Sequence, residues 1–287
     1  MRSRARKAPV GAHSAAVVSD ASPWSTTIQL DLLDLDPQDM TAEICRRAGI
    51  TQADVAAQMA PVPCETYSIA GRTNVSRGWH YRDHTQPHKP PRPDGSDKAH
   101  VAKQHDLLVS NILTAWKCDA DAGFKQLIFM ENPAAFLQHR PFMVRAEGML
   151  GLVKSVVNYC AFTHPVKKPT NIWTNARWTP KGNTGDGLCH GKCGFGEISK
   201  TTGKFKHFKA VAQEPYRECG VREKNAIPAN LLEELVQSVK SSKRARHKST
   251  IIDLCAGYQS LKPVAMQYGF NCIAVDIRGD RSRFRSA

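Results

Sequence analysis

The sequence predicts an α/β fold with a mostly parallel sheet, and two observations support this prediction. Stretches with strand character alternate along the chain with stretches of helical period, which is the pattern of strand–helix–strand units. Several strand stretches are apolar throughout, as in parallel sheets whose two faces are both covered by helices. The clearest unit is 249–277, "STIIDLCAGYQSLKPVAMQYGFNCIAVDI". It predicts a strand, a turn at Gly257, a helix and a second strand ending at Asp276.

The other predicted elements follow in order along the chain. Strand stretches are short, rich in apolar residues and bounded by turn residues. Helical stretches carry apolar residues three or four positions apart, such as Leu108, Ile112 and Trp116 in the longest of them. A polar loop rich in Gly, Pro, His and Arg occupies 71–98. We therefore expect strands at 28–32, 53–60, 125–133, 153–162 and 170–175, and helices at 38–50, 100–117 and 227–242.

The composition predicts an intracellular protein that binds a polyanion. The 287 residues suffice for one large α/β domain, or for a domain with a small insert. No stretch approaches the roughly 20 apolar residues of a membrane span, and the basic N-terminus lacks the apolar core of a secretory signal. The net charge of +14 favours nucleic acid as the partner. In such a protein the nine cysteines indicate free thiols, a nucleophile or a metal site rather than disulfides.

Three predicted strand ends carry groups suited to ligand binding, because parallel sheets place ligands at the carboxyl ends of their strands. Gly257, shortly after Asp253, would let the backbone approach a ligand closely. Asp276 ends the last strand, a position from which an acid can hold ribose hydroxyls. Asp31 ends the first strand and could accept a hydrogen bond from a base amino group. Each also has an ordinary interpretation, as a turn glycine, a helix cap or a surface acid.

Two other predicted strand ends carry candidate catalytic groups, a thiol and a carboxyl group. Cys64 follows Pro63 directly after an apolar strand, where its thiol would be exposed as a candidate nucleophile. Glu131 and Asn132 end the apolar strand of "IFMENPAAF". A carboxyl group held against apolar surface has a raised pKa and can donate a proton. The alternatives are a buried structural thiol and a loop acid.

The segment from Thr179 to Asn225 differs in kind, being rich in Gly and Lys with little periodicity. It contains a Cys-x3-Cys pair and two further candidate metal ligands. We favour a recognition loop region whose lysines contact phosphates, with no metal required. The alternative is a structural zinc site, for which this spacing is a weak signal. The candidate ligands are Cys189, Cys193, His207 and Cys219.

Taken together, these stretches resemble the DNA (cytosine-5)-methyltransferases. "PVPCETYS" resembles the Pro-Cys motif of that family, and "MENPAAF" resembles its Glu-Asn motif. "DLCAGYQSL" is similar to the first motif that binds S-adenosylmethionine (AdoMet), and "AVDI" to the acidic second motif. The similarity extends from about residue 26 to residue 277. The resemblance implies a Rossmann-like AdoMet-dependent methyltransferase fold.

The order of the motifs implies a circular permutation. In the family the AdoMet motif comes first, whereas here it follows the other motifs, after a basic linker, "SSKRARHKS". Permutation is tolerated where the ends of a fold lie close together. We therefore expect a disordered basic leader at 1–24 and the catalytic half at 25–178. A target-recognition insert would follow at 179–226, and the closing helix, linker and AdoMet unit at 227–287.

The resemblance also implies a mechanism and a set of roles. Cys64 would add to carbon 6 of a flipped cytosine, and Glu131 would hold N3 and the exocyclic amine. Carbon 5 would then take the methyl group of AdoMet, and loss of its proton would expel the cysteine. Lys167 or Lys168 would replace the family's arginine near the base, and Asn132 would shape the loop behind Glu131. Residues beside AdoMet would be Asp253, Cys255, Ala256 and Gly257 at the methionine end, Asp276 at the ribose, Asp31 at the adenine, and Pro63.

Duplex DNA is the expected substrate and a monomer the expected state. An RNA cytosine-5 methyltransferase would use the same chemistry, and the sequence does not separate the two. A catalytically lapsed relative that only binds nucleic acid is a further alternative, although a pure binder needs neither Cys64 nor Glu131. A zinc-dependent binding module would require stoichiometric metal in the insert.

Overall fold

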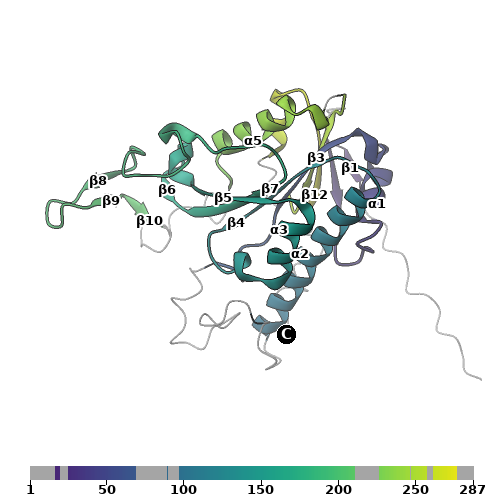
Figure 1. The fold of residues 1–287 in the computed structure, drawn as a ribbon, viewed down its shortest axis with the longest axis horizontal. Coiled ribbons are helices and arrows are strands. Elements are labelled where there is room, and N and C mark those ends of the chain that lie inside the picture. Colours follow the sequence, from purple (N-terminus) through teal and green to yellow (C-terminus); the bar gives the residue numbers. More distant parts are fainter. Residues whose placement is uncertain are drawn as a thin grey trace, which may run out of the picture.

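A central sheet of eight strands organises the molecule, which is described here from a computed structural model (Figure 1). The structure describes residues 17–19, 25–68, 89, 97–210, 226–245, 247–256 and 261–276. The strand order is β1-β2-β12-β11-β3-β4-β7-β5. The strands are β1 Val17–Ser19, β2 Ser25–Gln29, β3 Val55–Pro61, β4 Leu127–Pro133, β5 Val153–Asn158, β7 Pro169–Thr174, β11 Thr250–Leu254 and β12 Asn271–Asp276.

The pairing of the strands is mixed but mostly parallel. The five strands β2, β12, β11, β3 and β4 all run in one direction. β1 is antiparallel to β2, and β7 is antiparallel to both β4 and β5. Counted from β11 as first strand, the parallel set has the order 3-2-1-4-5 of doubly wound folds. The order of the connections therefore reverses between β11 and β3, where such folds place their ligands.

Helices cover both faces of the sheet. They are α1 Met40–Ala48, α2 Asp97–Asp121, α3 Pro141–Leu150, α5 Ala229–Ser241 and α6 Leu261–Gln267. Helices α1, α2 and α3 share one core with Ile128 and Met130 of β4. Helices α5 and α6 share the other core with Leu127 and Phe129 of the same strand. The alternation within β4 is the two-residue period of a strand that is buried on both faces. Figure 1 shows α5 above the sheet and α2 and α3 below it.

The apolar strands and the amphipathic helices explain why this sequence folds in this way. Every residue of β4 and of β11 is buried, so neither strand presents a polar face to water. α5 buries five apolar residues along one face, each contributing about 1.5–3 kcal/mol through removal from water. α1 ends at Gly49 and α3 at Gly151, both with the positive φ that stops a helix without strain.

A smaller region extends away from the sheet on the side of β5. It contains β6 Val166–Lys167, β8 Gly196–Ile198, β9 Phe205–His207 and β10 Lys209–Ala210. β8 and β9 form an antiparallel hairpin, and β10 pairs in parallel with β6. The hairpin lies at the far end of the molecule in Figure 1. The last part of the predicted insert, 211–225, lies outside the described residues.

The α/β prediction is confirmed, and four details differ from it. The first predicted strand is shifted, because β2 ends at Gln29 and a turn begins near Asp31. The strand expected at 153–162 ends at Asn158 and continues as a buried 3-10 turn, η4 Tyr159–Phe162. α3 was not predicted, and β1 lies within the expected leader. The predicted loop at 71–98 lies almost entirely outside the described residues. Within the described ranges, no helix combines the length and apolarity needed to cross a bilayer.

Candidate active site and metal site

The loop after β3 places Cys64 at the carboxyl edge of the sheet. β3 and β4 are parallel, and Pro61 pairs with Glu131, so the two strands end side by side. The carbonyl of Cys64 accepts hydrogen bonds from the N–H groups of Tyr67 and Ser68, which fix a tight turn. The thiol is half-buried. Cys64 and Glu131, far apart in sequence, are therefore brought to one edge.

Electrostatic effects on the Cys64 thiol oppose one another. Burial raises the pKa of the thiol, and the nearby Glu131 carboxylate raises it further. The Lys168 ammonium acts in the opposite direction and lowers this pKa. A thiolate here would depend on that positive charge, as nucleophilic cysteines do. The structure therefore places Lys168, rather than Lys167, beside the predicted nucleophile and carboxylate.

Glu131 is held by two side chains that reach it from another part of the chain. The Tyr159 hydroxyl donates to Oε1 of Glu131 at 2.7 Å, and Lys168 Nζ lies 3.7 Å from the same oxygen. The ammonium also lies 4.7 Å from the centre of the Tyr159 ring. Glu131 is only 5% exposed. The hydrogen bond from Tyr159 therefore orients the carboxylate, and the Lys168 ammonium compensates part of its charge. Both contacts are made almost out of contact with water.

Asn132 supports this arrangement from behind. Its side chain is fully buried, and its Nδ2 donates to the carbonyl of Val62 at 3.1 Å. This bond ties the end of β4 to the residue before Pro63. Asn132 thus contacts the start of the loop that leads to Cys64, and its expected role in shaping the loop behind Glu131 stays a prediction. Tyr159 was not predicted as a site residue; it begins the buried turn η4, within a stretch that was predicted to be a strand.

The predicted AdoMet residues gather at the ends of three neighbouring strands. Asp253 and Asp276 lie in β11 and at the end of β12, and both are buried. The N–H of Leu30 bonds the Asp276 carbonyl at 3.3 Å, which places Asp31 beside the same edge. Cys255 and Ala256 follow β11 and are buried, whereas Gly257 lies outside the described residues. Since β11 is next to β3, this group adjoins Pro63 and Cys64 along one edge.

Several details at this edge bear on ligand binding. Burial raises the pKa of Asp253 to about 8, and its Oδ1 has no hydrogen-bond partner among the described residues. Cys255 has a positive φ of 68°, unusual for a residue with a side chain. A buried polar atom without a partner and an unusual backbone angle are both typical of segments that bind a ligand. Asp31 accepts a bond from the Leu33 N–H at 2.9 Å, which forms the turn after β2.

Three cysteines and a histidine form a compact cluster in the smaller region. The side-chain ligand atoms of Cys160, Cys189, Cys193 and His207 all lie within 4.8 Å of one another. His207 Nε2 is 3.5, 3.1 and 3.3 Å from the three sulfurs in that order. A tetrahedral zinc site has N···S separations of about 3.6 Å, from Zn–N and Zn–S bonds of about 2.0–2.1 and 2.3 Å. The buried Cys3His group could therefore hold a metal such as zinc.

The surroundings of the cluster suit metal ligation. Burial and the Lys167 charge lower the pKa of His207, which keeps the imidazole neutral. Burial alone would raise the pKa of Cys189, but hydrogen bonds, the first from the Gly191 N–H, lower it overall. Burial raises the pKa of Cys193 overall, although a hydrogen bond from the Phe195 N–H acts in the opposite direction. Gly191 has a φ of +71° and packs against the Phe205 ring, so a side chain would not fit there.

The prediction about metal ligands was therefore partly correct. Cys189, Cys193 and His207 lie together, whereas Cys219 lies outside the described residues. The fourth member of the cluster is Cys160, which the sequence analysis placed in a predicted strand. The sequence analysis favoured a region without metal because Cys160, which lies outside the predicted insert, was not among its candidate ligands.

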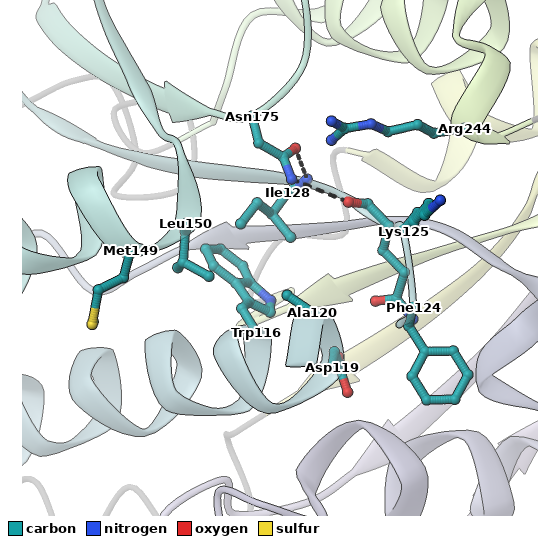
Figure 2. A pocket seen from close by; sticks show the side chains of 11 residues that line it. Trp116, Asp119, Ala120, Phe124, Lys125, Ile128, Met149, Leu150, Asn175 and Arg244 are labelled. Atoms are coloured by element: carbon teal, nitrogen blue, oxygen red, sulfur yellow. Dashed lines mark hydrogen bonds between the residues drawn. The ribbon is translucent and has the colours of Figure 1, made fainter. Parts of the chain in front are cut away.

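A separate cavity of about 240 Å³ lies near the amino end of β4, whereas Cys64 and Glu131 lie at the carboxyl ends of the strands. Its lining includes Trp116 and Leu150, which lie between Asn175 and Asp119 in Figure 2, and Arg244, which lies at the upper right of that view. The Asn175 side chain bonds the N–H of Ile128 and the carbonyl of Gln126. Its lining contains none of the predicted site residues. The cavity therefore belongs to the amino end of β4, away from Cys64.

Neither a scan against models of known protein families nor a search of curated proteins finds a match for this chain.

Proposed function

We propose that the protein is an AdoMet-dependent methyltransferase that methylates carbon 5 of cytosine in DNA through a covalent adduct of Cys64. One observation carries the proposal: Cys64, Glu131 and Lys168 come from three segments and meet at one edge of the sheet. A thiol, a carboxylate and an ammonium group are the groups that this reaction needs. The structural alternatives of a buried thiol and a loop acid do not account for the three lying together.

The adduct would form by attack of the Cys64 thiolate on carbon 6 of the ring. Lys168 favours the thiolate, and Glu131 would bond N3 and the exocyclic amine of the cytosine. Tyr159 and Lys168 both contact Oε1 of Glu131, so Oε2 would contact the ring. A base in a duplex must first leave the stack, at a cost of a few kcal/mol. After methyl transfer, loss of the carbon-5 proton expels Cys64 and regenerates the thiol.

AdoMet would supply the methyl group at the neighbouring edge. Asp276 would bond the ribose hydroxyls, and Asp31 would accept a hydrogen bond from the adenine amino group. Oδ1 of Asp253 is buried and has no hydrogen-bond partner in the part of the chain that the structure describes, which fits a site that is completed by a polar ligand. Cys255, Ala256 and Pro63 would line its wall. The residues described here are thus compatible with AdoMet.

The strand order supports the permuted methyltransferase fold. β11 and β12 come last in the chain but lie in the middle of the sheet, between β3 and β2. Reading from β11 through β12 to β2, and then from β3 to β4, restores the doubly wound order. The AdoMet motifs therefore occupy the first two strands of that order, as the resemblance implies.

We further propose that zinc occupies the Cys3His cluster and that this region contacts the nucleic acid. Four lysines in this region are exposed and can approach phosphates: Lys192, Lys200, Lys204 and Lys206. Zinc with three thiolates and a neutral histidine carries a net charge of about −1, which the nearby Lys167 offsets.

The test is transfer of label from AdoMet to nucleic acid by the purified protein. Duplex DNA and structured RNA are offered separately, and the labelled base is identified after digestion. We expect 5-methylcytosine in DNA. Label in RNA alone would establish the alternative RNA enzyme, and AdoMet binding without transfer would favour the lapsed relative.

The matched pair of variants is Cys64→Ala and Cys118→Ala, since both thiols are partly exposed. We expect Cys64→Ala to abolish transfer while leaving nucleic-acid affinity nearly unchanged, and Cys118→Ala to behave as wild type. Transfer that survives Cys64→Ala would refute the covalent mechanism.

A further inference from the structure

One peptide unit connects the metal cluster to the candidate active site. Tyr159 and Cys160 are consecutive residues of η4, and both are fully buried. The Tyr159 hydroxyl reaches Glu131 at 2.7 Å, while the Cys160 sulfur lies 3.5 Å from His207 Nε2. The two side chains therefore serve different sites from adjacent backbone positions. A displacement of η4 would move both.

Lys168 is tied to the same framework. The Tyr159 N–H donates to the Lys168 carbonyl at 3.2 Å. The strand before Lys168, β6, pairs with β10, which begins two residues after His207. The segment before the Cys189–Cys193 pair is also joined to this frame, because the N–H of Asn158 donates to the Gly187 carbonyl at 2.9 Å. Tyr159 and Lys168 are thus connected through backbone hydrogen bonds and strand pairing to the segments that carry the four candidate ligands.

Little else holds the smaller region in place. Its own core among the described residues consists of the three cysteines, with the partly buried Phe195 and Phe205 packed against them. A core of this size is insufficient to order a segment without a disulfide or a metal. No disulfide joins these cysteines, which are free. The order of this region is therefore expected to depend on the metal.

We propose that the metal ion in the Cys3His cluster holds η4 in place and so positions Tyr159 and Lys168 against Glu131. Tyr159 is then a positioning residue that fixes Oε1 and directs Oε2 toward the base. The role of Glu131 rests on the function proposed above, whereas the physical coupling of the two sites does not. The experiment therefore has one arm that needs no activity.

The first arm measures hydrogen exchange by mass spectrometry on the full-length protein, with zinc bound and after its removal by a chelator. We expect about one zinc per chain. Metal removal should speed exchange in 189–207, and also in 159–168 and in the end of β4. Peptides from α1 and β12 serve as the control and should not change. Exchange that opens only in 189–207, or a protein that binds no zinc, would overturn the proposal.

The second arm compares Tyr159→Phe, which removes only the hydroxyl, with Tyr268→Phe, a partly buried tyrosine at the end of α6. We expect Tyr159→Phe to lower kcat about ten- to a hundredfold, with zinc content and AdoMet affinity unchanged. Zinc removal should then cost this variant less activity than it costs wild type, because the two changes act on one carboxylate. Equal and additive losses would contradict the coupling.

The two proposals fail in different ways. If the zinc-loaded wild type transfers no methyl group to DNA or RNA, the proposed function fails, and hydrogen exchange still decides the coupling. If transfer occurs but survives zinc removal and Tyr159→Phe at full rate, the function stands and the coupling is refuted.

Discussion

The protein contains two kinds of thiol site, and the difference between them lies in their neighbours. Cys64 stands apart from the other cysteines, with an ammonium and a carboxylate beside it. Cys160, Cys189 and Cys193 lie together around one imidazole. A thiol among charged groups of both signs is suited to attack and release a substrate, whereas grouped thiols with a neutral histidine are suited to hold a cation. Surroundings rather than residue type assign the chemistry.

Metal removal should separate the two sites most strongly. Loss of bound zinc is expected to lower the free energy of unfolding by about 4 kcal/mol, for free zinc a thousandfold above its Kd. The three cluster thiols should then become alkylated, whereas Cys64→Ala should leave zinc content and stability unchanged. Thermal unfolding and peptide-resolved alkylation measure these effects. Equal stability with and without zinc would remove the basis for calling the cluster a metal site.

Replacing Glu131 with Gln tests the other side of the comparison. The amide has nearly the same shape but cannot carry the charge that stabilises a protonated ring. We expect methyl transfer to fall about a hundredfold or more, with zinc content unchanged. Glu197→Gln, at an exposed position of β8, is the control and should retain full activity. A Glu131→Gln variant with normal kcat would show that the carboxylate has no part in the reaction.

Replacing Lys168 with Met should sharpen the contrast at Cys64 itself. Without the ammonium, the thiol loses the largest influence that opposes burial and the Glu131 charge, so its pKa should rise further. The rate of Cys64 alkylation measured against pH should therefore move to higher pH. Lys181→Met, at an exposed position, is the control. A profile that stays in place, or moves to lower pH, would show that Lys168 does not act on Cys64.

The last effect concerns Asp253, which is buried and whose pKa is raised by burial alone. Its folded pKa of about 8 lies above the ordinary value of 3.8, so the folded protein binds more protons between these values. The free energy of unfolding should therefore fall as pH rises from about 4 to 8, by at most about 1.4 kcal/mol per pH unit from this group. Asp253→Asn should flatten that slope in denaturant titrations without AdoMet. An unchanged slope would mean that Asp253 titrates normally.

Local sequence patterns were sufficient to predict most strands of the sheet, but not the direction in which each strand runs. The buried strands β3, β4, β11 and β12 were predicted because each is a continuous apolar run. The antiparallel direction of β7 is set by the path of the chain and leaves no trace in its composition. α3 did carry signals, a Pro at its first position and Gly151 after its end, which were overlooked.

The candidate site shows the same division. Cys64 and Glu131 were predicted because each lies at the end of an apolar run, which marks the end of a strand. The structure brings the two strand ends side by side. Tyr159 and Cys160 were missed because η4 interrupts what looked like one strand, and this turn decides where both side chains point. Metal ligands contributed by distant segments meet only through tertiary folding.

The position of β12 also affects how the protein is made. Ile28 pairs with Val275, so the strand β12 that pairs with β2 is made long after β2 itself. Until then a ribosome-bound chain exposes the edges of β2 and β3, which are open to pairing with other chains. The strand pair β11–β12 closes the gap last and completes the edge that bears Asp276. During synthesis, the edge that bears Asp276 therefore forms only after β12 has emerged from the ribosome.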